Sequence, residues 1–214
     1  RHGAVSMDEF RAAGYVAPAL MNFLALIGWS YDEKTTVMSR EELVERFSLE
    51  RVGTSPATFD YAKLDWMNGV YLRAMPPGEY ADALVQFLRE QGSDWDEERV
   101  REAVPLVQEK IARLGEFPAF AGFLFGPTAP DPALLRDGHA VLAKARRRLG
   151  ELEPFTAARI EEELRGLCDR LGLKPRQAFQ PIRVAVTGST ISPGLFESIE
   201  LLGREETLAR LDAA

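Results

Sequence analysis

The stretch APALMNFLALIG, residues 17–28, decides the fold class of this 214-residue chain. It is apolar almost throughout, and it carries a proline at its second position, which the first turn of a helix tolerates. It ends on a glycine, which is a common stop signal for a helix. We therefore predict a buried helix here, and the segments that follow repeat the helical pattern.

A second helix is predicted to begin after Ser39. Residues 39–42, Ser-Arg-Glu-Glu, form a capping box, in which Ser39 accepts from the Glu42 amide and Glu42 reaches back to Ser39. Met38 and Leu43 are placed to form the hydrophobic staple on either side of this cap. The pattern indicates a defined helix start rather than a loop.

Helical spacing of apolar residues predicts further helices over residues 80–90, from Asp94 or Asp96 to 114, over 132–149 and over 156–171. Gly172 stops the last of these, and the segment GPTAPDP, residues 126–132, predicts a loop or a subdomain junction.

The C-terminal part begins with an ambiguous segment. Residues 182–187 alternate like a strand, but a strand would have no partner here, so we predict helix. Ser192 and Pro193 are interpreted as the N-cap and first residue of a helix that Gly203 ends, and residues 204–211 as a last short helix. The predicted fold class is all-α.

The charge is distributed unevenly along the chain. The net charge is −7, which argues weakly against nucleic acid as a partner. Residues 136–186, however, contain 11 Lys and Arg against 7 Asp and Glu, a net charge of +4. Such a segment either binds a polyanion locally or is simply a solvated helix face.

Composition excludes several classes of function. No apolar run is long enough to span a membrane. The one cysteine, Cys168, is predicted to fill the core, and with only His2 and His139 beside it we expect no zinc site. There is no glycine-rich phosphate loop. A lone cysteine also suits the cytoplasm, and we expect a monomer there with no membrane partner.

Three blocks of the sequence are long enough to compare with a known family. They are RHGAVS with GYVAPALMNFLALIGWS (residues 1–6 and 14–30), FSLERV to YLR (residues 47–73), and QPIRVAVTG to LLGRE (residues 180–205). In this order they resemble bacterial glutamyl-tRNA synthetases. In that family the first block follows the lysine-rich ATP-site signature. Arg1 matches the last residue of that signature and is the cofactor-binding candidate.

The resemblance implies an architecture for the whole chain. Residues 1–75 are expected to form a helical stem-contact region. Residues 76–130 and 131–214 are expected to form the two subdomains of a helical anticodon-binding cage. The catalytic Rossmann-type domain is expected upstream of Arg1. By itself the chain is therefore expected to use no cofactor and to form no aminoacyl-adenylate, while the parent ligase uses ATP and magnesium.

The resemblance also implies site residues, and none of them is catalytic. In the second block, Lys63 and Arg73 match positions that neutralise tRNA phosphates. Trp66 lies between them and either rests on a ribose or packs in the core. Lys110 matches a position where some members place an arginine that senses the third anticodon base. Lysine keeps the charge without the planar fork, or it is simply solvated.

In the third block, Arg183 matches a position that contacts the first anticodon base, and its guanidinium can make two parallel hydrogen bonds to a base edge. The rival interpretation is that Arg183 only ties helices together. Ser192, Pro193 and Leu195 match the loop and helix start beside the anticodon, where free backbone amides can bind oxygens. Ser192 and Pro193 could equally be a mere helix start.

The expected partner is tRNA(Glu), with tRNA(Gln) as a second candidate. A different class of function stays open, which is a helical protein-interaction scaffold derived from a synthetase, without tRNA specificity. Binding of tRNA to the purified chain separates the two.

Overall fold

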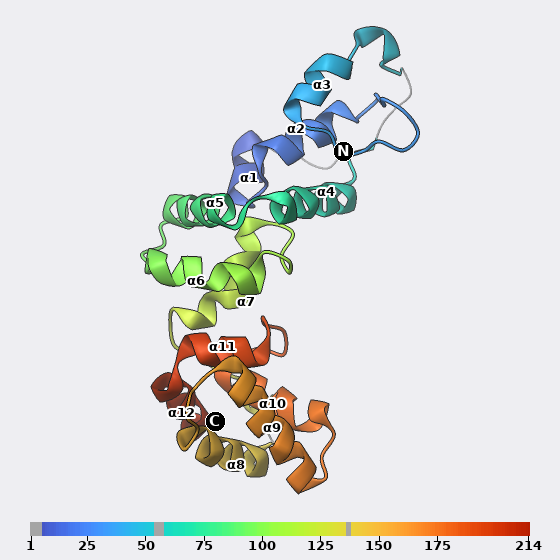
Figure 1. The fold of residues 1–214 in the computed structure, drawn as a ribbon. Coiled ribbons are helices and arrows are strands. Elements are labelled where there is room, and N and C mark those ends of the chain that lie inside the picture. Colours follow the sequence, from blue (N-terminus) through green and yellow to red (C-terminus); the bar gives the residue numbers. More distant parts are fainter. Residues whose placement is uncertain (1–5, 54–57, 136–137) are drawn as a thin grey trace. The chain divides into compact units, whose positions relative to one another are not determined.

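The computed structural model describes residues 6–53, 58–135 and 138–214, and every regular element within these ranges is helical (Figure 1). This confirms the predicted all-α class. The chain divides into two compact units, unit 1 (residues 1–117) and unit 2 (residues 118–214). No described helix is both long and apolar enough to cross a membrane.

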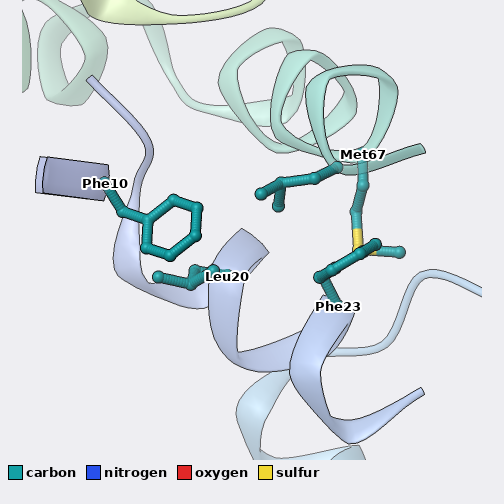
Figure 2. Close-up of a cluster of buried hydrophobic side chains, with 5 residues drawn as sticks. Phe10, Leu20, Phe23 and Met67 are labelled. Atoms are coloured by element: carbon teal, nitrogen blue, oxygen red, sulfur yellow. The ribbon is translucent and has the colours of Figure 1, made fainter. Parts of the chain in front are cut away.

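Unit 1 is built from α1 (Met7–Ala12), α2 (Ala17–Ala25), α3 (Arg40–Arg46), η1 (Leu49–Arg51), α4 (Tyr61–Ala74), α5 (Pro77–Glu90), α6 (Glu97–Val107) and η2 (Leu114–Glu116). Helix α2 packs against α4, and α5 packs against α6. Figure 2 shows one core cluster of this unit, in which Phe10 of α1 and Leu20 and Phe23 of α2 meet Leu64 and Met67 of α4. This packing holds one face of α4 in the core and leaves the other for solvent.

Unit 2 follows from α7 (Phe117–Ala121), η3 (Gly122–Leu124) and η4 (Pro132–Leu134) to α8 (His139–Gly150), α9 (Ala157–Leu171), α10 (Pro175–Thr187), α11 (Leu195–Leu202) and α12 (Arg204–Ala213). Helix α7 begins on the last residue of unit 1. Helix α8 packs against α9, α10 and α12, and α11 packs against α9 (Figure 1). The buried face of α10, including Ile182 and Val186, supplies much of this core.

Several local predictions are confirmed. The Ser39–Glu42 capping box is formed in both directions, and Met38 and Leu43 lie in one buried cluster with Trp29. Asp96 caps α6 by accepting from the Arg99 amide. Residues 182–187 are helical, as part of α10.

The predicted helix stops are also confirmed where glycine is required. Gly172 ends α9 with a φ of 63° and Gly203 ends α11 with a φ of 88°, which is the left-handed half of backbone space that only glycine adopts readily. Cys168 is buried, and its Sγ lies 3.2 Å from the Leu164 carbonyl oxygen, as expected of a core filler.

Several predicted helices were wrong in extent. The helix predicted over residues 17–28 ends at Ala25, before the expected stop at Gly28, and the helix predicted over 80–90 begins at Pro77. The helix predicted to reach residue 114 ends at Val107, although Ile111 and Leu114 remain buried beyond it. The helix predicted over 132–149 is broken, because α8 begins only after Gly138. A Cβ at Gly138 would lie 2.5 Å from the Cβ of Pro181, so the close approach of α10 leaves no room for a side chain at this helix start.

The three-part division predicted from the sequence differs from the two compact units. Its first boundary, after residue 75, falls between α4 and α5 within unit 1. Its second boundary, after residue 130, falls just before η4 within unit 2. The division stays a prediction about function rather than about compactness.

Candidate nucleic-acid interface

Helix α4 presents a cationic, aromatic face to solvent. Lys63, Trp66 and Arg73 are all exposed, and spacings of three and seven residues place them on one side of the helix. Within the described part of the chain, neither Lys63 nor Arg73 has an ion-pair partner. Two uncompensated cations flanking an aromatic ring are suited to phosphates and a ribose or base.

Trp66 is half exposed, with 50% of its surface accessible. The core-packing interpretation of Trp66 is therefore wrong, because Leu64 and Met67 on the opposite side of α4 fill the core instead. An exposed indole ring offers a flat face on which a base can stack. The tryptophan thus remains a candidate stacking platform.

Arg73 folds back along α4 toward Gly69. A Cβ at Gly69 would lie 2.9 Å from Arg73 Nη1, so the glycine leaves the room that the guanidinium occupies. The buried Gly69 also lies against Ala112, whose Cα would be 3.5 Å from that Cβ. The position of the Arg73 guanidinium therefore depends on a small residue one turn earlier.

Lys110 lies exposed in the turn that follows α6, and this turn is tied to α4. The buried Gln108 side chain donates from Nε2 to the carbonyl oxygens of Leu72 (3.0 Å) and Met75 (2.8 Å) at the end of α4. Asn68, also fully buried, donates to the Ala112 carbonyl oxygen at 2.5 Å. These two amides position the Lys110 turn against the end of α4 that bears Arg73.

Sequence reasoning missed Asn68 and Gln108. Asn68 also accepts at 2.9 Å from the Val16 amide, so one side chain joins three segments of unit 1. The available signal was a polar amide at a position that helical spacing assigns to the core. A buried amide must find partners, so such residues mark tertiary contacts.

The third block brings Arg183 together with Ser192 and Pro193 in unit 2. Nη1 of Arg183 donates to the carbonyl oxygens of Pro193 (2.7 Å) and Ser192 (3.3 Å) and also to the Ser192 hydroxyl. The half-buried Arg183 therefore holds the loop between α10 and α11. Among the described contacts only Nη1 is used, which leaves the Nε and Nη2 edge for a ligand.

Burial lowers the pKa of the Arg183 guanidinium from its ordinary value, and the nearby Glu197 carboxylate opposes that shift. Arginine nevertheless keeps its proton in proteins, so the group stays cationic. A partly desolvated guanidinium interacts more strongly with a base edge than a fully hydrated one does.

Ser192 and Pro193 are not the N-cap and first residue of α11, and that prediction was wrong. Gly194 is the N-cap and Leu195 the first helical residue. The Ser192 hydroxyl is taken by Arg183 and by the Pro193 carbonyl oxygen at 3.1 Å, so it caps nothing. Pro193 and Leu195 are buried, and the Pro193 carbonyl oxygen already accepts from Arg183, so neither side chain faces a ligand.

The start of α11 already has a negative charge beside it. A Cβ at Gly194 would lie 2.3 Å from Glu197 Oε2, so this carboxylate folds back over the first turn. A carboxylate there interacts favourably with the positive end of the helix dipole. It would compete with a phosphate at this helix start, which makes a base edge the better ligand for this corner.

The candidate residues fall into two groups. Lys63, Trp66, Arg73 and Lys110 belong to unit 1, whereas Arg183, Ser192, Pro193 and Leu195 belong to unit 2. The ATP-site candidate Arg1 lies outside the described residues. Among the residues that the structure describes, no group of three or more His, Cys, Asp or Glu is placed to hold a metal ion.

Two family models match the chain. Residues 79–214 match the anticodon binding domain, and residues 1–66 match the catalytic domain of class I tRNA synthetases of the E and Q type. The first match covers most of the chain. The expected resemblance to this group of proteins is thereby confirmed.

Similar proteins extend the match over the whole chain. The chain is 46% identical to a glutamate–tRNA ligase of a Roseiflexus species, covering 98% of the chain and 44% of the relative. It is 41% identical to the glutamate–tRNA ligase of Herpetosiphon aurantiacus, covering 100% of the chain and 46% of the relative. The chain thus spans less than half the length of these relatives.

A solved structure shares the fold. A glutamate tRNA ligase from Elizabethkingia meningosepticum, crystallised in complex with its amino acid, superposes with a TM-score of 0.82 at 23% identity. The superposition covers 95% of this chain and 42% of that one. At this level of identity the likeness supports the fold of the chain.

Proposed function

This chain belongs to the anticodon-binding domain family, and we propose that it is the tRNA-reading part of a glutamate–tRNA ligase. The observation that carries the proposal is the similarity to such ligases over the whole chain, in blocks that include every candidate contact residue of α4 and the Arg183 loop. The exposed, unpaired cations of α4 support a phosphate-binding role. The open guanidinium edge of Arg183 supports a base-reading role.

The proposed partner is tRNA(Glu), which the protein would bind in the cytoplasm as a monomer. In the parent enzyme, the carboxylate of glutamate would attack the α-phosphate of ATP, release pyrophosphate and form an aminoacyl-adenylate. A hydroxyl of the terminal ribose of tRNA would then take the glutamyl group and release AMP. ATP and magnesium would serve that step, while this chain would hold and check the tRNA.

The proposal includes tRNA(Gln) as a second partner. Lys110 carries a point charge on a flexible stem, and it cannot reproduce the two parallel hydrogen bonds of an arginine. Its exposed place after α6 leaves it free to approach a base or a phosphate. The third anticodon base differs between glutamate tRNA and glutamine tRNA. We therefore propose that the protein discriminates only weakly between the two tRNAs at this base.

The α4 contacts make a prediction about salt. With roughly five phosphate contacts in all, the logarithm of the tRNA binding constant should fall against the logarithm of salt concentration with a slope of about −4. Lys63→Ala removes one exposed cation without touching the core. We expect about threefold weaker binding of every tRNA at ~0.1 M salt and a slope smaller by about one unit.

Filter binding of labelled tRNA over a salt series measures both quantities. Lys34→Ala, which removes an exposed lysine of the loop before α3, is the matched control and should leave the slope unchanged. A wild-type slope near zero would contradict the proposed function. Equal slopes for wild type and Lys63→Ala would remove Lys63 from the interface.

A further inference from the structure

Unit 2 contains a groove lined by four cations that belong to none of the candidate contacts above. Lys144, Arg147 and Arg148 project from one face of α8, and Arg170 projects from α9. They surround a cavity of about 360 Å³. Glu151 is the single carboxylate among its described lining residues. Four cations against one carboxylate give this lining a surplus of positive charge.

Two of these arginines are held in place by one carboxylate. Glu163 Oε1 lies 3.6 Å from Arg148 Nε and 2.6 Å from Arg170 Nη2. The Glu163 side chain is only 24% exposed, and both arginine side chains are 44% exposed. One shared carboxylate therefore orients two guanidinium groups from two helices and leaves a surplus positive charge between them. Such an arrangement lowers the ordering cost of binding an anion.

An apolar cavity continues the cationic one. This second cavity, of about 500 Å³, shares Lys144 and Leu171 with the first. Its apolar lining includes Leu134, Val141 and Leu173. In a nucleic acid strand, charged phosphates alternate with ribose carbons and base faces. A cationic cavity beside an apolar cavity can therefore accept both parts of such a strand.

The adjoining apolar cavity and the Arg183 site occupy different faces of α10. Gln177 and Pro181, one turn apart, line the apolar cavity. Arg183 comes two residues after Pro181, which is about 200° around the helix, and it contacts the α10–α11 loop instead. A base that Arg183 reads would therefore not fill this groove.

We propose that this groove binds the sugar–phosphate backbone of an RNA strand, separately from the face that reads the anticodon. Lys144, Arg147, Arg148 and Arg170 would neutralise phosphates, and the adjoining apolar cavity would take a ribose or a base. The identification of the RNA as tRNA rests on the proposed function above. The groove supplies affinity without sequence preference, because phosphates carry no base identity.

The test compares two double variants that remove the same charge from the full chain. Lys144→Ala/Arg147→Ala removes two cations of the groove. Arg146→Ala/Arg159→Ala removes two exposed arginines of α8 and α9 that pair with Asp212 and Glu162 and do not line it. The probes are tRNA(Glu), a copy with a replaced anticodon, and an unstructured oligouridine, each measured by filter binding over a salt series.

For the groove variant we expect the slope of the logarithm of the binding constant against the logarithm of salt concentration to become less steep by about 1.5 units. We expect the affinity at ~0.1 M salt to fall about fivefold. The loss should be the same for both tRNAs and should also appear with oligouridine. The control variant should stay within about twofold of wild type. Thermal melting should confirm that both variants fold.

Three results would overturn the proposal. The first is equal losses in the two double variants. The second is a loss confined to the native anticodon. The third is calorimetric binding of inorganic phosphate that the groove variant abolishes while its RNA affinities stay unchanged, which would mark a site for free phosphate. Oligouridine separates this proposal from the proposed function, because a failure to read tRNA leaves the oligouridine result standing.

Discussion

Arg210→Met is expected to lower the free energy of unfolding of unit 2 by about 3 kcal/mol, because it strands buried carbonyl groups. Arg210 is only 8% exposed. Its Nη1 donates to the Val186 carbonyl oxygen at 2.7 Å, and its Nη2 donates to those of Phe123 and Gly126 at 2.9 Å each. One side chain of α12 thus ties the end of α10 to the segment around η3.

Methionine fills a similar length but cannot donate, so three acceptors lose a partner. Each buried acceptor left unpaired costs about 1–3 kcal/mol, less whatever water recovers. The Nε contact to Glu206, at 2.7 Å, adds less, because that carboxylate is half exposed. The network acts mainly through the backbone oxygens it satisfies.

The positions of the tryptophans allow this loss of stability to be assigned to unit 2. All three tryptophans, Trp29, Trp66 and Trp95, lie in unit 1. In a urea titration, circular dichroism should therefore show an early transition for Arg210→Met, while tryptophan fluorescence keeps its wild-type midpoint. Arg146→Ala, which loses an exposed pair with Asp212, should leave the dichroism midpoint close to that of the wild type. An unchanged dichroism midpoint for Arg210→Met would show that the network contributes little.

Arg183→Lys should weaken binding of the native tRNA about 10- to 100-fold, corresponding to about 1–3 kcal/mol, and should hardly affect a tRNA with a changed first anticodon base. Nη1 holds the loop, so the Nε and Nη2 edge is the part that can read a base. A lysine ammonium can replace the contact to the Pro193 carbonyl oxygen. The lysine then has no planar pair of donors left to contact a base edge.

Arg176→Lys is the matched control, since Arg176 is an exposed arginine on the same helix. Binding to native and swapped tRNAs and thermal melting should be measured on both variants. If Arg183 serves only to hold the loop, Arg183→Lys will melt earlier and keep its anticodon preference. A folded Arg183→Lys protein with the wild-type ratio of dissociation constants removes the base-reading role.

Local signals predicted the parts of the fold that local physics controls. The Ser39 capping box and the Gly172 stop need only neighbours within one turn, and both are formed as predicted. The end of α6 at Val107 could not be predicted in this way, because Gln108 turns its amide to carbonyl oxygens of α4. The need for glycine at position 138 likewise depends on Pro181, which is far away in sequence.

The candidate site also combines features that the sequence indicated with features that only tertiary packing creates. Lys63 and Arg73 were expected as contacts from the family resemblance, and both are exposed on α4. Ser192 was misassigned as a helix cap because its hydroxyl is taken by Arg183, a contact that only the packing of α10 against the following loop creates. The cationic groove combines residues of α8 and α9, and the sequence indicated only the surplus charge of that region.

Anticodon reading by this chain can be tested in a single titration experiment. The purified chain is titrated with tRNA(Glu) and with the same tRNA carrying three replaced anticodon bases, at one salt concentration of ~0.1 M. We predict a dissociation constant at least about tenfold lower for the native anticodon, because single-stranded bases are read by side chains such as Arg183. Equal dissociation constants for the two tRNAs would contradict it.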